Sequence, residues 1–578
     1  MRSAILSCSF ILVLALPALA QDEPFRKPFE KYELTCGYAG GRLVMALASD
    51  PKSFNPVTAQ ETSTTEVTSL IFEGLTRSDP MTLEVIPDLA QSWETQDGLT
   101  WIFHLRKDVR FSDGVPFDAD DVLFTFNDLI YNPDIPSSVK DIFTIDGKTI
   151  KVEKIDAYNV RFVLPTKFAP FLRALSAEIL PRHKYAAAAR QGKFSSSLGV
   201  DSRPQDICGS GPYRLKRYLA GERLDLERNP FYWKKDSRGA NLPYLDGLTM
   251  LVIPSADARL LRFLDGELDY YDLRPGDLSV LGPRRASGRF TIYNAGPAWG
   301  TNFLALNQNS GNNPLTGKPY VPAAKLAWFA DPDFRRAIAY AIDRSKIIQV
   351  VMQGLGQPQY SPESPANRLF YSSDVTAYPY DPQRAQAILE KMGFTVGEDG
   401  VLKDPHGVRL EIDFFTNANS DERVKMATLV KSDLEKIGFK INLLALDFNS
   451  LVNRLTATRD WEMILIGLTG GPEPYFGKNV WSYKGTMHLW NLSGRPQAPY
   501  EEQIEEIFNQ SAVTLDFSQR KELFLRWQRI VADQQPFIYT VLPYALYAVR
   551  DRFGNLYPTV NAGALGQVEY IFEHDRNF

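Results

Sequence analysis

The side chains that could do chemistry are scattered along this chain. The motifs H-E-x-x-H, G-x-S-x-G and C-x-x-C are absent from the sequence. No metal-ligand spacing relates the five histidines, which are His104, His183, His406, His488 and His574. An S-x-x-K pattern at Ser137 and Lys140 arises by chance in a chain of this length, and a loop is the simpler interpretation. We therefore expect no catalytic residue, no bound metal and no cofactor, with a hydrolase as the alternative.

The composition is that of a globular protein without the basic surface typical of nucleic-acid binding. Hydrophobic residues make up 44% of the 578 residues and aromatic residues 12%, which is enough for a sizeable core. Lysine and arginine total 64 against 69 acidic residues, and no basic stripe is visible. We exclude nucleic acid as a partner.

The N-terminus carries an export signal. Arg2 precedes an apolar run through Phe10–Leu16, and Ala18-Leu19-Ala20 forms an A-x-A cleavage site before the polar Gln21. A membrane anchor is the competing interpretation, but the run is too short to span a bilayer. We expect a signal peptide at residues 1–20, cleaved after Ala20, and a mature protein in the periplasm.

The elements around residues 98–130 are the clearest in the chain. Side chains alternate between apolar and polar from Leu99 to Leu105, which predicts a half-buried strand. A turn at Ser112-Asp113-Gly114 follows, and Asp118 stands where it would cap the helix behind it. Further predicted elements are a strand at 42–47, a helix at 62–75, a hairpin at 150–164, helices at 331–344, 381–393 and 421–438, and strands at 410–415 and 440–446. The later alternation of strands and helices predicts an α/β unit.

Several motifs resemble one protein family. The string TWIFHLRKDVRFSDGVPFDADDV at 100–122 is similar to the signature of the family 5, peptide-type solute-binding proteins of bacterial ABC importers. Other runs also resemble motifs of this family. They are GSGPYRL at 209–215 with NPFYW at 229–233, LDGELD at 264–269 and FRRAIAYAIDR at 334–344. The motifs stand in the family's order, and the resemblance runs from about Leu43 to the C-terminus.

The resemblance implies a fold and a function. The fold would be α/β, a two-lobe periplasmic-binding-protein type II fold with an extra subdomain in the first lobe, three subdomains in all. The implied bounds are 37–75 for the first segment of the lobe I core, 76–205 for the extra subdomain, 206–302 for the second core segment, 303–535 for lobe II and 536–578 for the closing segment. A monomer would close its cleft on a peptide or peptide-like solute and deliver it to ABC permease subunits.

Two cysteines remain after the signal is removed, Cys36 and Cys208. In an oxidising compartment they could form a disulfide, or they could be two unrelated buried thiols. The resemblance assigns both to one lobe, which favours the bridge. In the chain-entropy model a bridge closing so long a loop would add roughly 4–5 kcal/mol.

The chain departs from the family where peptide-binding relatives hold the solute's ammonium group. Their G-W-x-x-D run matches residues 467–471, so Leu468 replaces the aromatic residue and Gly471 falls where the aspartate is expected. Glu473 is the nearby acidic residue that could substitute, and its alternative role is holding the turn. We select aromatic, amide and turn residues as candidate ligand-binding positions: Thr62, Asn417, Asn419, Phe448, Thr469, Gly470, Gly471, Glu473, Tyr475 and Trp481. The missing aspartate leaves a non-peptide solute open, such as an oligosaccharide, an opine or a metal chelate, and an exported hydrolase is the alternative of another class.

Overall fold

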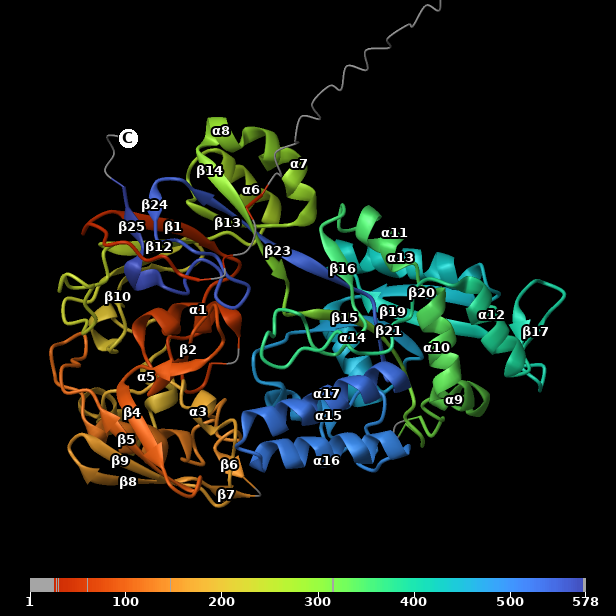
Figure 1. Cartoon of the computed structure of the whole chain (residues 1–578), viewed down its shortest axis with the longest axis horizontal. Helices are drawn as coiled ribbons and strands as arrows, with labels where there is room; N and C mark the ends of the chain where they lie inside the picture. Colours follow the sequence, from red (N-terminus) through yellow and green to blue (C-terminus); the bar gives the residue numbers. More distant parts are fainter. Residues whose placement is uncertain are drawn as a thin grey trace, which may run out of the picture.

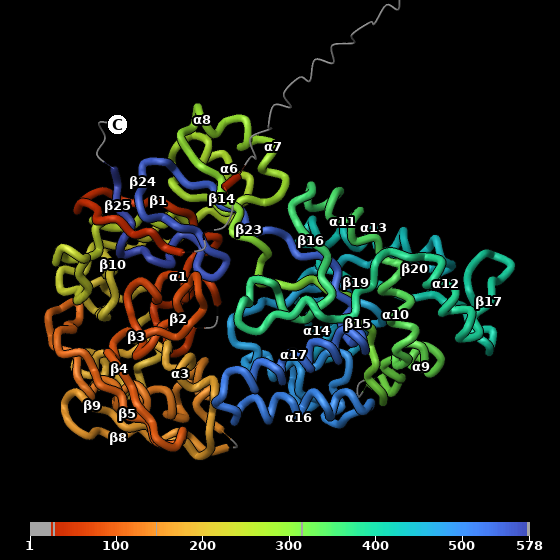
Figure 2. Tube along the Cα trace, in the orientation of Figure 1, coloured from red at the N-terminus to blue at the C-terminus, as the bar shows by residue number. Residues whose placement is uncertain are grey.

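The protein has a two-lobe α/β fold (Figures 1 and 2). The computed structural model describes residues 25, 26, 29, 31–59, 61–145, 147–313 and 316–574, so the expected signal peptide lies outside the described residues. Lobe I contains the early and the last described segments of the chain, and lobe II contains the segment between them, which is coloured green to blue in Figure 1. No helix among the described residues is long and apolar enough to cross a bilayer.

The core of lobe I is a four-stranded sheet with one parallel pair. The parallel strand pair is β1 (Arg42–Leu47) and β12 (Gly247–Val252), and β11 (Arg223–Arg228) and β10 (Tyr213–Leu219) extend the sheet in antiparallel order. Helix α1 (Thr62–Ile71) packs beside this sheet and buries Val67, Leu70 and Ile71. The predicted strand at 42–47 is therefore confirmed.

The strand at the centre of the motif-rich region belongs to a second sheet of lobe I. Its order is β4 (Ala90–Thr95), β5 (Thr100–Leu105), β9 (Asn159–Val163) and β8 (Lys151–Asp156). Trp101, Phe103 and Leu105 are buried while the residues between them are half-exposed, as the alternation predicted. The predicted cap is also confirmed: the Asp118 carboxylate accepts the backbone N–H of Asp120 at 2.8 Å and begins α2 (Ala119–Leu123), which continues as η1 (Phe124–Ile130).

Lobe II is built on a five-stranded mixed sheet. Its order is β20 (Lys440–Leu446), β19 (Glu411–Asn417), β21 (Met463–Leu468), β15 (Thr301–Leu306) and β22 (Phe537–Tyr539). Strand β19 runs parallel to both β20 and β21, which confirms the predicted α/β character. The helices of this lobe include α9 (Ala323–Ala330), α10 (Pro332–Ala341), α11 (Arg344–Val350), α12 (Pro382–Lys391), α13 (Asp421–Glu435), α14 (Phe448–Asn453), α15 (Lys478–Trp481), α16 (Pro499–Val513) and α17 (Phe517–Gln534).

Two crossings join the lobes. The first lies between β14 (Phe290–Pro297) and β15, and the second lies between β22 and the long strand β23 (Val541–Arg550), which pairs with β13 (Tyr270–Leu273) and β14. Because β22 lies in the lobe II sheet, the return to lobe I begins with β23 and not at residue 536. The lobes also touch away from the crossings: Phe168 packs edge-on against Tyr475 at 5.4 Å between ring centroids.

Two sequence expectations need correction. Helix α1 ends at Ile71 and not at residue 75, because the carbonyl of Ile71 accepts the N–H of Gly211 at 2.8 Å and the chain then becomes extended. The candidate disulfide, which the sequence favoured over two unrelated thiols, is not formed, since both cysteines are free. Cys36 Sγ lies 3.2 Å from Ser237 Oγ, whereas Cys208 is buried with its Sγ 3.6 Å from Ser112 Oγ, so the two thiols occupy different environments.

Candidate functional site

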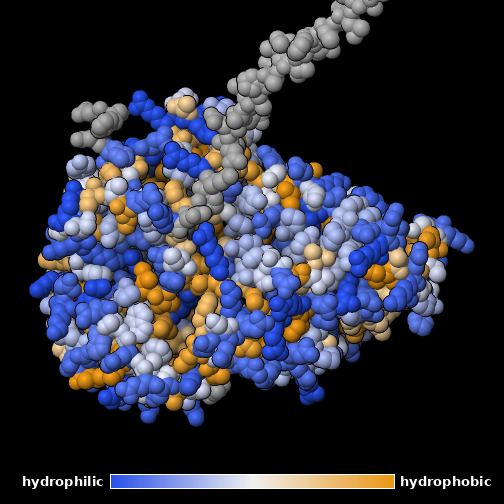
Figure 3. All heavy atoms as spheres, viewed as in Figure 1, coloured by the Kyte–Doolittle hydropathy of each residue, from blue (hydrophilic) through white to orange (hydrophobic). Residues whose placement is uncertain are grey.

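Two adjoining cavities mark the candidate site. The first, which we call the lobe I cavity, has a volume of about 680 Å³ and is lined by lobe I residues. The second, the interlobe cavity, has a volume of about 570 Å³ and is lined mainly by lobe II, with Ser78, Arg173 and Ser176 from lobe I. Ser78 and Ser176 line both cavities, so the two are contiguous. In Figure 3, hydrophilic side chains cover most of the visible face and hydrophobic ones gather along the boundary between the lobes.

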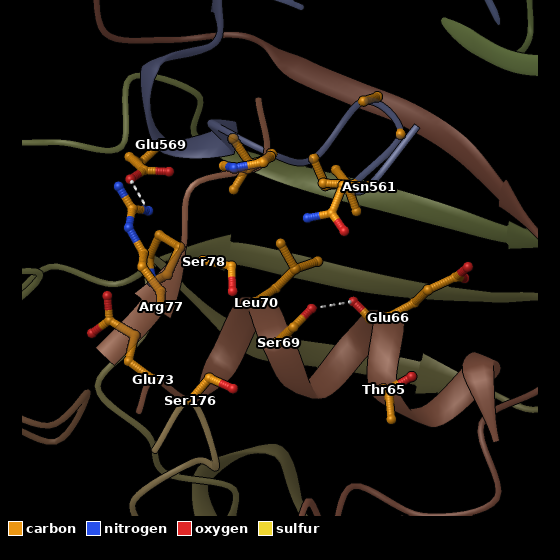
Figure 4. A pocket seen from close by; sticks show the side chains of 18 of the residues that line it. Thr65, Glu66, Ser69, Leu70, Glu73, Arg77, Ser78, Ser176, Asn561 and Glu569 are labelled. Atoms are coloured by element: carbon orange, nitrogen blue, oxygen red, sulfur yellow. Dashed lines mark hydrogen bonds and ion pairs between the residues drawn. The ribbon is translucent and has the colours of Figure 1, made fainter. Parts of the chain in front are cut away.

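Helix α1 forms one wall of the lobe I cavity, and the last described segments of the chain form the wall opposite (Figure 4). Thr62, one of the predicted ligand-binding residues, lines this cavity from the first position of α1. Glu66 and Ser69 of the same helix face the segment that carries Asn561. Thr62 therefore lies on a cavity wall. Its contact with a solute stays a prediction.

A buried ionic cluster ties the end of α1 to the C-terminal segment. Lys234 Nζ lies 3.7 Å from Glu73, 3.4 Å from Asp88 and 3.2 Å from Glu569, and Arg77 Nη1 lies 3.2 Å from the same Glu569 oxygen. Although burial opposes ionisation, these two cations lower the pKa of Glu569 to about 2. Burial and the Asp88 charge raise the pKa of Glu73. The cluster therefore holds three carboxylates against two cations.

Three further carboxylates of the lobe I cavity face no ion-pair partner. Glu66, Glu178 and Asp272 line the cavity, and no lysine, arginine or histidine of the described residues lies within 4.0 Å of their carboxylate oxygens. Loss of hydration raises the pKa of Glu66 to about 7, with a contribution from Asp272, and raises that of Glu178 to about 7. The Asp272 side chain is exposed in the cavity. The protein around it still reduces the hydration of its carboxylate, which raises its pKa as well. This wall is suited to positively charged groups.

The interlobe cavity contains the predicted turn after β21. Five predicted ligand-binding residues line it together: Thr469, Gly470, Gly471, Glu473 and Trp481. A Cβ atom at Gly471 would meet no atom within 4 Å, so the position where the family's aspartate is expected opens onto free space. Aromatic side chains supply much of the remaining wall, namely Trp299, Phe303, Phe476, Trp527, Phe537 and Tyr539.

Glu473 is already bound within the protein. Its two carboxylate oxygens accept two N–H groups of Arg520 at 2.5 and 3.0 Å, and Oε1 also accepts the backbone N–H of Tyr475 at 3.0 Å. The Glu473 side chain is 3% exposed and that of Arg520 is 6% exposed. A bidentate pair of this kind satisfies the carboxylate. Of the two roles open to Glu473, holding the turn is the one these contacts support.

The remaining predicted residues lie outside both cavities. Asn417 ends β19, is buried, and accepts a hydrogen bond from Arg423 at 3.1 Å. Asn419 and Phe448 are exposed on lobe II. Tyr475 stands beside the interlobe cavity, where its ring packs against Phe168 of lobe I. The structure thus brings five of the ten candidates into one cavity and Thr62 into the adjoining one.

Sequence reasoning missed several cavity residues. Glu363 lies in the segment Ser361-Pro362-Glu363-Ser364, and Arg173 lies in the short helix α3 (Phe171–Ala174). Neither occupies a motif, so no local signal marks them. Trp299 lies two residues before β15 and belongs to no motif either.

The structure also assembles a polar group away from the cleft. Asp113, His183 and Cys208 come from separate parts of lobe I, and their ligand atoms lie within 4.8 Å of one another. His183 Nε2 is 2.8 Å from Asp113 Oδ2, so the two side chains already form a pair. Burial raises the pKa of the Cys208 thiol to about 11, which opposes the thiolate that nucleophilic catalysis requires.

Comparisons with known proteins show the family. Residues 84–487 match the model of the bacterial extracellular solute-binding proteins, family 5 Middle. A probable ABC transporter-binding protein of Deinococcus radiodurans is 30% identical over 553 residues, which cover 90% of this chain and 91% of the relative. The chain therefore belongs to family 5 of the bacterial extracellular solute-binding proteins. This is a family of binding proteins and not of enzymes.

Solved structures agree at the level of the fold. The oligopeptide-binding protein AppA of Bacillus subtilis, in complex with a nonapeptide, superposes with a TM-score of 0.70 at 23% identity, covering 93% of this chain and all of that one. The periplasmic binding protein MelB of Agrobacterium fabrum, in complex with stachyose, superposes with a TM-score of 0.71 at 21% identity, covering 94% of this chain and 87% of that one. Since the same fold accompanies a peptide in one protein and an oligosaccharide in the other, the fold alone does not select the solute.

Proposed function

We propose that this protein captures a peptide or peptide-like solute between its lobes and delivers it to the permease of an ABC importer. The observation that carries the proposal is the pair of contiguous cavities, which together place charged groups, hydrogen-bonding groups and aromatic walls between the two lobes. An extended peptide offers backbone hydrogen-bonding groups and varied side chains, and a long cleft of this composition suits both. The protein would act as a monomer in the periplasm after cleavage at Ala20, and it would catalyse no reaction.

We also propose bounds for the units of the fold. Residues 76–205 would form the extra subdomain of lobe I, which includes the β4-β5-β9-β8 sheet. Residues 37–75 and 206–302 would form the lobe I core, lobe II would run from residue 303 through β22, and the return to lobe I would begin with β23. The two crossings would act as the hinge when the lobes close on a solute.

A second candidate is a non-peptide solute in the same cleft, such as an oligosaccharide. The open space at Gly471 and the aromatic side chains around it favour this alternative, because sugars pack their C–H faces on aromatic rings. One relative also supports a sugar as the solute. The periplasmic alpha-galactoside-binding protein of Rhizobium meliloti is 25% identical over 566 residues, which cover 90% of this chain and 79% of that one.

Native mass spectrometry of the protein purified from periplasm tests the proposal. The complex is weighed intact, the protein is denatured, and the released small molecules are identified. We expect co-purified peptides of mixed sequence. A single non-peptide mass would overturn the peptide proposal and support the second candidate.

A further inference from the structure

Glu363 is a buried carboxylate without a cation. It lines the interlobe cavity from the segment that follows β16 (Gly356–Pro358), and only 9% of the residue is exposed. Its Oε2 accepts one hydrogen bond, from Asn367 Nδ2 at 2.8 Å. Among the described residues, no lysine, arginine or histidine nitrogen comes within 4.0 Å of this carboxylate. A carboxylate in such a place costs free energy unless a partner neutralises it.

The charged groups around Glu363 leave it uncompensated. Glu473 is a neighbouring carboxylate, and its charge is matched by Arg520 of α17. Tyr539 of β22 also lies nearby and is buried. Arg173 faces the same cavity from lobe I, but its guanidinium donates to Ser78 Oγ and to the carbonyl of Leu83, both at 2.7 Å. Burial, with the Glu473 charge added, raises the pKa of Glu363 to about 8.

Two tryptophans that line this cavity also have indole N–H groups without a hydrogen-bond partner among the described residues. Trp527 lines it and is 1% exposed, yet its indole N–H has no hydrogen-bond partner among the described residues. The indole N–H of Trp299, another lining residue, is buried and unpartnered in the same sense. Both nitrogen atoms are closed to solvent, so neither is reachable from the cavity unless the side chains around it move, and the case for a ligand rests on Glu363.

We propose that Glu363 binds a cationic nitrogen of the solute, an ammonium or guanidinium group, in the interlobe cavity. The carboxylate supplies the negative charge, and the aromatic walls formed by Trp481 and Tyr539 add cation–π attraction. The proposal rests on the proposed function and narrows it to solutes that carry an ammonium or guanidinium group.

Glu363 fits this role better than Glu473, which the sequence suggested. Glu473 is already paired with Arg520, so a cation from a solute would gain little there. Glu363 is uncompensated, so a bound cation would hold it in the ionised state. Binding at pH 7 should then release about one proton, because a group with a pKa near 8 is mostly protonated before the cation arrives.

The test uses the full mature protein and two tripeptide libraries, one with free amino termini and one acetylated at the amino terminus, with stachyose as the non-peptide probe. Retained molecules are identified by mass spectrometry, and affinities follow by calorimetry in phosphate and in Tris at pH 7. The test variant is Glu363→Gln. The matched control is Glu505→Gln, since Glu505 is also buried, at 8% exposed, but lines neither cavity.

We expect the wild type and Glu505→Gln to retain free-amine peptides with proton release. Glu363→Gln should lose at least about 10-fold in affinity and the proton release with it. Retention of acetylated peptides only when they contain lysine or arginine would support the proposal with a side-chain cation in place of the terminal ammonium. Equal retention of both libraries by the wild type would overturn it even if Glu363→Gln did not fold. Unchanged peptide affinity in Glu363→Gln would overturn it and leave the peptide function standing, whereas binding of stachyose and no peptide would remove both.

Discussion

The pair formed by Glu473 and Arg520 offers a quantitative test of the turn that lines the interlobe cavity. Replacing Arg520 by methionine removes the cation bound to a carboxylate whose side chain is 3% exposed. Removing one partner of a buried ion pair leaves an uncompensated charge, which costs about 3–5 kcal/mol of unfolding free energy. The same change also frees the Ser511 carbonyl that accepts Arg520 Nε at 2.9 Å, which adds about 1 kcal/mol.

A double variant separates the charge from the packing. Adding Glu473→Gln to Arg520→Met removes the unpaired charge, while the amide side chain introduced at position 473 would still have an oxygen to accept the N–H of Tyr475. We therefore expect the double variant to recover at least about 2 kcal/mol relative to Arg520→Met alone. Arg529→Met is the matched control on the same helix, because Arg529 is 44% exposed and pairs at the surface, where such pairs contribute about 0–1 kcal/mol.

Urea unfolding followed by tryptophan fluorescence measures these differences, with the slope of the transition checked in every variant. If Arg520→Met were as stable as Arg529→Met, the claim that the buried ion pair stabilises this turn would be refuted. A double variant as unstable as the single one would show that packing, and not charge, causes the loss.

Three other expectations follow from particular contacts. The pKa of Glu569 is lowered from 4.5 to about 2, so its contribution to stability is complete above pH 4.5 and is lost as the pH falls toward 2; urea midpoints against pH should show an acid slope that Glu569→Gln reduces. Without reductant, Ellman's reagent should titrate Cys36 in the native protein and both Cys36 and Cys208 in denaturant, whereas no thiol in denaturant would mean a bridge. Gly211→Ala should destabilise by about 1–3 kcal/mol, because its Cβ would lie 2.7 Å from the α1 backbone, while Gly471→Ala, which meets no atom within 4 Å, should unfold at nearly the wild-type urea concentration.

Local patterns were sufficient for many of the elements. The alternation from Leu99 to Leu105 and the capping aspartates Asp118 and Asp331 depend on residues a few positions apart, and the strand and both helix starts form where they were predicted. The turn at 469–473 was located by its match to the family's G-W-x-x-D run, and it lies where β21 ends. Motif order then indicated the family.

Long-range packing explains where such patterns were insufficient. Gly209 and Gly211 belong to the motif GSGPYRL, and neither has a positive φ. Both are needed because their backbone lies against the last turn of α1. Asn417 was a plausible cleft residue, but Arg423, six positions later in α13, binds its side-chain oxygen. The two glycines are constrained by a helix far away in the sequence, and the hydrogen bond to Asn417 depends on how α13 packs against β19.

Charge compensation in the cleft was decided by the tertiary structure alone. The sequence placed an acidic residue, Glu473, near the expected ammonium site, but it could not show that Arg520, 47 positions later, already neutralises it. Equally, nothing in the run around Glu363 indicates that its carboxylate is buried without a cation among the described residues. Secondary structure follows from neighbours along the chain, whereas the availability of a charge depends on which distant side chains the fold places within a few ångströms of it.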